Sequence, residues 1–127
     1  MVRRPPAAPF VHLDVHSGHS RQAGVASIER LVARASAEGH AALALTDTDG
    51  AYGLPHFQVC CDAVDLRPLY GAELHGDPRR DGGGDALRAR AVLLAENERG
   101  YAHLCRLISR RHKAEGETPE RPVLFDE

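Results

Sequence analysis

Histidine and carboxylate side chains occupy every second position of a short stretch near the start of the chain: His12, Asp14 and His16. Apolar residues fill the positions between them. This is the two-residue period of a β-strand, so the three polar side chains are expected to share one face. Imidazole nitrogen and carboxylate oxygen suit zinc, manganese or iron. The pattern allows a metal site, although a polar strand face at the surface explains the same three residues.

Two later stretches also place a carboxylate at the end of a run that resembles a strand. Ala41–Leu45 is apolar and is followed closely by Asp47, and Arg67–Leu74 contains Glu73. A short apolar run that stops at carboxylates and a glycine is typical of a buried strand opening into a loop. α/β folds place their chemistry at the carboxyl ends of such strands. An Asp-Gly turn and an exposed rim glutamate are the simpler explanations for each residue alone, and the three strand ends together favour a shared site.

Helices are predicted between these strands. Ser27 is typical of an N-cap and Gly39 of a left-handed C-cap, which predicts a helix over Ser27–Glu38. This helix would join the strand around Phe10–His16 to the strand that begins at Ala41. The three elements form a β-α-β unit, whose two strands should be parallel with a right-handed crossover.

The second half of the chain contains two further predicted helices and one further strand. Pro55 fits the first turn of a helix whose apolar stripe contains Phe57, Cys60, Cys61 and Val64. Ala89–Ala95 is predicted to be a fourth strand. After it, Asn97 caps a helix over 98–113. Its inner face is formed by Tyr101, Leu104, Leu107 and Ile108.

Composition excludes several classes of function. The formal net charge is -2 and the pI is about 6.4, so the chain lacks the global positive charge of a nucleic-acid or anionic-membrane binder. Its three cysteines contain no CxxC pair, which argues against a disulfide framework and against a thiolate zinc site, and fits a reducing cytosol. No apolar stretch is long enough for a membrane span or a signal peptide. We therefore expect a cytoplasmic protein.

The chain divides by composition into three parts. Residues 1–9 are rich in proline and arginine and are expected to be a disordered lead. Residues 10–113 carry the predicted strands and helices. Within them, residues 76–86 include three consecutive glycines and are predicted to be a flexible loop. Residues 114–127 are polar and contain proline, as a linker would.

Four stretches in this order resemble the PHP domain at the front of bacterial DNA polymerase III α-type subunits, including the error-prone polymerases. They are FVHLDVHS, ALALTDTDGAYGL, RPLYGAEL and VLLAENERGYAHLCRLIS. The resemblance implies an α/β fold, namely the first part of a PHP-type β/α barrel with parallel strands and crossover helices, incomplete in this chain. It also implies a cluster of divalent metals, zinc or manganese, that lowers the pKa of a bound water for phosphoester chemistry.

The resemblance assigns the metal ligands position by position. His16 matches the second histidine of the family's first motif, Asp47 the aspartate of the second and Glu73 the glutamate of the third. Asp14 stands where the first motif usually has histidine, and Thr48 replaces a histidine of the second. The implied ligand set is Asp14, His16, Asp47 and Glu73, with His12 as a further candidate. These substitutions imply a weak or lost metal site, and no catalytic residue is assigned.

The resemblance also implies a role and partners. We expect the N-terminal PHP piece of a DNA polymerase III α-type or error-prone polymerase, which takes part in replication or repair synthesis. The family's later ligands and its palm carboxylates lie beyond this sequence, so the chain alone would not polymerise DNA. Its partners would be the rest of the polymerase or other replisome or translesion subunits, with DNA contacted indirectly and no membrane. The alternatives are a metal-dependent phosphoesterase, of the 3′-5′ exonuclease or pyrophosphatase type, and a metal-free scaffold module.

Overall fold

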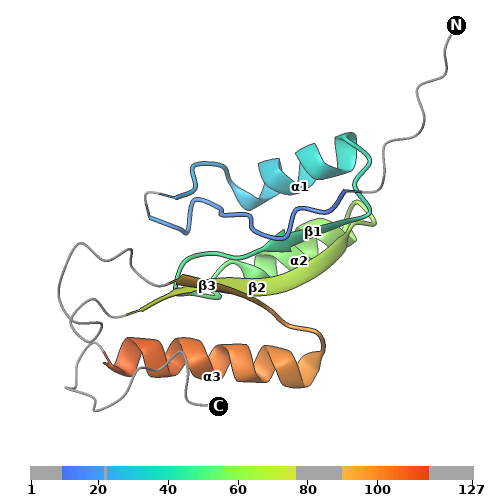
Figure 1. Cartoon of the computed structure of the whole chain (residues 1–127). Coiled ribbons are helices and arrows are strands. Elements are labelled where there is room, and N and C mark those ends of the chain that lie inside the picture. Colours follow the sequence, from blue (N-terminus) through green and yellow to red (C-terminus); the bar gives the residue numbers. More distant parts are fainter. Residues whose placement is uncertain (1–9, 22, 77–89, 115–127) are drawn as a thin grey trace, which may run out of the picture.

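The computed structural model describes residues 10–21, 23–76 and 90–114 (Figure 1). The predicted lead, the tail from residue 115 and residues 77–86 of the predicted loop lie outside the described residues. The elements follow in the order α1 (Ile28–Ala37), β1 (Ala42–Leu45), α2 (Leu54–Asp62), β2 (Arg67–His75), β3 (Arg90–Leu94) and α3 (Glu98–Ala114). None of the helices in these described ranges has the length and apolar character needed to cross a membrane.

The three strands form one sheet in the order β1-β2-β3. β1 and β2 are parallel and are joined through α2, as a crossover connection requires. β3 pairs with β2 in the antiparallel direction, with Glu73 opposite Val92. The predicted α/β class is confirmed, but the prediction of parallel strands is wrong for β3. The glycine-rich sequence after His75 carries no apolar period for a crossover helix, and an antiparallel neighbour needs none.

The stretch Phe10–His16, predicted as a strand, is extended but is not a regular strand. It makes one isolated parallel bridge, between His12 and Leu43. Two of its carbonyl oxygens also accept backbone hydrogen bonds: His12 O accepts from Ala44 N (3.0 Å), and Val15 O accepts from Thr46 N (2.8 Å). The ladder breaks because Val15 N donates to the Thr46 side chain (3.0 Å) instead of to a backbone carbonyl. The predicted parallel direction across α1 is nevertheless confirmed.

The ends of the helices follow their capping residues. Ser27 Oγ accepts a hydrogen bond from Arg30 N, and Gly39 after α1 has a φ of 75°, as predicted. Asn97 Oδ1 accepts from Gly100 N (3.0 Å) at the start of α3. The stripe predicted on α2 is too long, because Val64 lies beyond the helix and is exposed. The chain has already turned there, since Leu66 N donates back to Cys61 O (3.0 Å).

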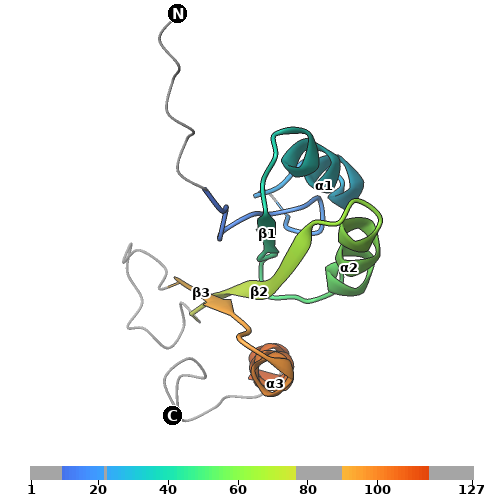
Figure 2. The same cartoon turned by 90° about the vertical axis from the view of Figure 1, so that its right-hand side faces the viewer.

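All three helices pack on the outer face of the curved sheet (Figure 2). One apolar cluster joins α1 and α2 to β1, and a second joins α3 to β2. Ala72 and Leu74 of β2 face α3, so Glu73 between them points to the opposite, inner face. Val92, which is paired with Glu73, lies on that inner face and is 38% exposed. No helix of the described residues covers the inner face.

Candidate metal centre

Three side chains from two separate stretches of the chain meet at the carboxyl-terminal edge of β1 and β2. The ligand atoms of Asp14, His16 and Glu73 all lie within 4.8 Å of one another. His16 Nε2 is 3.2 Å from Asp14 Oδ1 and 3.7 Å from Glu73 Oε2. Asp14 is exposed, His16 is half-buried and Glu73 is buried. The structure therefore brings together three of the four ligands that the resemblance implied.

The backbone around this group is fixed by hydrogen bonds between neighbouring segments. Glu73 N donates to Asp47 O (3.1 Å), and Asp49 N donates to Glu73 O (2.8 Å). Asp49 adopts a left-handed φ of 48°, and its Oδ1 accepts from His75 N (2.9 Å). The turn after β1 is thereby joined to the end of β2. On the other side, the Thr46 hydroxyl donates to Asp14 Oδ1 (2.9 Å).

The hydroxyl of Ser20 determines which nitrogen of His16 carries hydrogen in the neutral ring. Ser20 donates its single hydrogen to Asp47 Oδ1 (2.6 Å), because a carboxylate can only accept. Ser20 Oγ lies 2.9 Å from His16 Nδ1, so that nitrogen must donate to it. The lone pair then lies on Nε2, which faces Asp14 and Glu73. Such orientation of a histidine by an outer partner is usual for metal ligands.

Asp47, the fourth implied ligand, is not part of the ligand group. It is buried, and its Oδ1 accepts from Ser17 N (2.7 Å) as well as from Ser20 Oγ. Its Oδ2 accepts from Ser17 Oγ (2.7 Å). These contacts hold the loop that follows His16 against the end of β1. Sequence reasoning did not identify Ser17 and Ser20 as functional residues. The signal that could have found them is the pair of hydroxyl residues, three positions apart, directly after His16.

His12 and Thr48 also lie outside the group. The ring of His12 packs edge-on against Phe10 and His40, with centroids 4.7 and 5.2 Å away. Thr48 Oγ1 is 3.3 Å from His16 Nδ1, the nitrogen that faces away from the ligands. Thr48 can therefore support the orientation of His16, whereas His12 contacts neither of the two carboxylates in the contacts described.

The guanidinium of Arg90 and the imidazole of His75 already contact the Glu73 carboxylate. Arg90 Nη1 donates to Oε2 at 3.0 Å, and His75 Nε2 lies 2.8 Å from Oε1. Arg90 stands at the beginning of β3, and its side chain is 65% exposed. Oε2 is also the atom that faces His16, so Arg90 competes with any metal ion for it. Sequence reasoning missed Arg90 because its contact depends on the antiparallel direction of β3.

The donor set fits a single divalent ion of the zinc or manganese type. One imidazole nitrogen and two carboxylate oxygens leave coordination positions for water or for a phosphate oxygen. When bound, such an ion lowers the pKa of a coordinated water and stabilises negative charge on phosphorus. Asp14, His16 and Glu73 would hold it, while Ser20 and Asp47 would orient His16.

The sequence matches the family model described as "PHP domain" over residues 12–126. It is 40% identical over 108 residues to the DNA polymerase III subunit alpha of Treponema pallidum, covering 81% of this chain and 9% of that protein. It is 34% identical over 120 residues to the error-prone DNA polymerase of Cutibacterium acnes, covering 93% and 11%. The chain therefore spans about a tenth of the length of these curated relatives.

Two solved structures share the fold at lower sequence identity. A protein of Bifidobacterium adolescentis assigned as a metal-dependent phosphoesterase superposes with a TM-score of 0.56 at 18% identity, over 88% of this chain and 37% of that one. An amidohydrolase of Chromobacterium violaceum, solved with bound sulfate and no metal, gives 0.56 at 24% identity, over 84% and 36%. This chain corresponds to about a third of either structure.

Proposed function

Because the chain belongs to the PHP domain family, we propose that it is the N-terminal PHP module of a bacterial DNA polymerase of the DNA polymerase III α or error-prone type. The observation that carries the proposal is the match of 81–93% of the chain to polymerases of both names at 34–40% identity. The activity of the whole polymerase would lie in chain beyond this module. Its principal partner would then be the rest of the same polymerase.

The inner face of the sheet supports a partner of this kind. Val92 and Leu94 of β3 are exposed there, 38% and 41% respectively, beside the buried Glu73. Apolar side chains on a sheet face are normally covered by a further layer of structure. Further barrel strands from the same polymerase would supply that layer.

The DNA sequence downstream of codon 127 tests the polymerase assignment. We expect an open reading frame that continues into a second set of histidine and aspartate motifs and then into the carboxylates of a polymerase palm. Two results together would overturn the assignment. The first is a stop codon directly after codon 127. The second is the absence from the genome of a separate polymerase gene whose product gives primer extension when it is mixed with this chain.

The second candidate function is metal-dependent phosphoester hydrolysis at the ligand group. The specific observation that favours it is the convergence of Asp14, His16 and Glu73, with His16 held in the tautomer that ligates through Nε2. Within this module the three residues would bind the ion, and Arg90 at Glu73 would offer a cation to a phosphate oxygen. Thr48 provides no imidazole ligand, and Arg90 competes with a metal ion for Glu73 Oε2. We therefore propose that the module is a scaffold that retains weak metal binding.

Metal binding at the ligand group is expected to raise the melting temperature of the chain. Manganese is the suitable probe, because it prefers the nitrogen and oxygen donors of this group to thiolates. At a concentration one hundred times the dissociation constant, a ligand specific for the native state adds about 2.7 kcal/mol of stability. Differential scanning fluorimetry should show this stabilisation in the wild type and lose it in His16→Ala.

His103→Ala is the matched control, because His103 is an exposed histidine of α3. It should keep the full response to manganese. A wild-type chain that does not respond to manganese would leave the metal-free scaffold as the function of this module.

Replacing Arg90 by glutamine is expected to strengthen manganese binding about fivefold. The substitution removes the cation that donates to Glu73 Oε2, and a partly exposed ion pair of this kind is worth about 1 kcal/mol. Isothermal titration calorimetry measures the change directly. Arg110→Gln, at an exposed position of α3, should leave the affinity unchanged. Equal or weaker binding by Arg90→Gln would show that Arg90 does not compete with the metal.

A further inference from the structure

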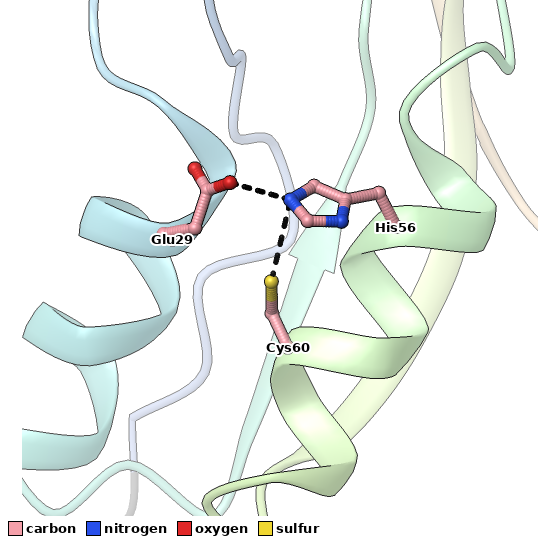
Figure 3. Close-up of side chains that lie close together, drawn as sticks. All are labelled: Glu29, His56 and Cys60. Atoms are coloured by element: carbon pink, nitrogen blue, oxygen red, sulfur yellow. Dashed lines mark hydrogen bonds and ion pairs between the residues drawn. The ribbon is translucent and has the colours of Figure 1, made fainter.

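A second group of ligand-type side chains lies between helices α1 and α2 and shares no residue with the Asp14, His16 and Glu73 group. It consists of Glu29 from the first turn of α1 and of His56 and Cys60 from α2 (Figure 3). The three side chains point toward one another, and their ligand atoms all lie within 4.8 Å. The absence of a CxxC pair argued against a thiolate zinc site, and sequence reasoning did not connect these residues because 27 positions separate Glu29 from His56.

The local sequence fixes the positions of these three residues. His56 and Cys60 are four positions apart on α2, so their side chains project from the same side of the helix. Each ligand also has a buried neighbour in the sequence: Ile28 precedes Glu29, Phe57 follows His56, and Cys61 follows Cys60. Those three neighbours belong to the apolar cluster that joins α1 to α2. The backbone beneath the exposed ligands is therefore held by core packing.

The distance between the sulfur of Cys60 and the nitrogen of His56 suits a single tetrahedral ion. Cys60 Sγ and His56 Nε2 are 3.6 Å apart. Two ligands of one tetrahedral zinc ion, with Zn–S of about 2.3 Å and Zn–N of about 2.05 Å, would be separated by about 3.5 Å. His56 Nε2 lies 2.5 Å from Glu29 Oε1, which is shorter than an ordinary hydrogen bond and closer than two ligands of one zinc ion, about 3.4 Å apart. The Glu29 side chain is 60% exposed, so it can move back by the roughly 0.9 Å needed to admit an ion.

Without a metal, a hydrogen atom occupies the centre of this group. The hydrogen bond from His56 is the largest influence among those that lower the pKa of the Glu29 carboxyl to about 2. The same Nε2 faces Cys60 Sγ. An ion would replace that hydrogen. A neutral His56 would bind the ion through Nε2 with its hydrogen on Nδ1, and the Cys60 thiol would release its proton to solvent.

We propose that Glu29, His56 and Cys60 form a second metal site, which binds a zinc-type divalent ion and leaves its fourth position open to water or an external ligand. A thiolate, an imidazole and a carboxylate together favour zinc and cobalt over manganese, magnesium and calcium. The site is separate from the Asp14, His16 and Glu73 group in both its residues and its metal preference.

Cobalt titration of the whole 127-residue chain tests the proposal. Cobalt bound to a thiolate gives a charge-transfer band in the near ultraviolet, which the oxygen and nitrogen ligands of the other group cannot produce. We expect this band in the wild type and in His16→Ala, and its loss in Cys60→Ser. Glu29→Gln should keep the hydrogen bond to His56 but weaken cobalt binding at least tenfold. A band that survives Cys60→Ser, or no band in the wild type, would overturn the proposal.

Alkylation of the three cysteines gives a second readout that does not depend on cobalt. Zinc should slow the reaction of Cys60 with iodoacetamide, as followed by peptide mass spectrometry. Cys105, on α3, should react at the same rate with and without zinc, and buried Cys61 should stay unmodified in the native protein. Zinc that protects Cys60 equally in wild type and in His56→Ala would also contradict the site. Circular dichroism can confirm that these surface variants remain folded.

Discussion

Replacing Asp47 by alanine should lower the free energy of unfolding by about 3–5 kcal/mol, because it leaves three buried donors without their acceptor. Those donors are Ser17 N, Ser17 Oγ and Ser20 Oγ, all within 2.6–2.7 Å of the carboxylate. Each unsatisfied buried group is worth about 1–3 kcal/mol, and partial relaxation reduces the sum. Urea denaturation followed by circular dichroism measures the loss.

Two variants accompany this experiment. Asp62→Ala removes an exposed carboxylate near the end of α2 and should change the stability by less than about 0.5 kcal/mol. Asp47→Asn keeps one acceptor oxygen but introduces an amide among donors, so it should lie between wild type and Asp47→Ala. If Asp47→Ala were as stable as Asp62→Ala, the hydrogen bonds around Asp47 would not stabilise the fold.

Replacing Gly24 by alanine should destabilise the protein by about 3 kcal/mol and displace the loop that carries His16 and Ser17. A Cβ atom at this position would lie 2.1 Å from Ser17 O and 2.7 Å from His16 O. Both are backbone atoms, which a side-chain rotation cannot move away. Overpacking of this kind typically costs 1–3 kcal/mol, and more where backbone must shift. Manganese binding should weaken as well, because Nε2 of His16 would leave its place beside Glu73.

Gly18→Ala is the matched control within the same loop. A Cβ there would meet only Ala26 O at 3.8 Å, which is ordinary contact. It should therefore preserve stability and manganese affinity within experimental error. The prediction for Gly24→Ala is contradicted if this variant binds manganese as tightly as Gly18→Ala does.

The sequence predicted those parts of the fold that local rules determine. Ser27, Gly39 and Asn97 are capping residues whose effect depends on their immediate neighbours, and they placed the ends of α1 and the start of α3 correctly. The apolar run before Asp47 likewise predicted β1. The direction of β3 was not predictable in this way, because strand pairing is decided by contacts between distant residues.

The candidate site was predictable from residue types only in part. Asp14, His16 and Glu73 were identified from their chemistry and from the family resemblance, and the structure brings them together. Asp47 has the same chemistry, yet its oxygens face Ser17 and Ser20. A carboxylate placed where it could bind a metal and one that accepts hydrogen bonds from hydroxyls look alike in sequence. Only the position of the surrounding donors distinguishes them.

The antiparallel pairing of β2 with β3 allows the stretch of chain between the two strands to vary in length. His75 and Arg90 are paired across the two strands, so the stretch 76–89 begins and ends at neighbouring points of the sheet. Closing a loop between such fixed ends becomes only about 0.6 kcal/mol harder for each doubling of its length. Insertions and deletions between these two residues would therefore leave the pairing of β2 with β3 intact. A peptide tag could be inserted there without disturbing the apolar clusters under the sheet.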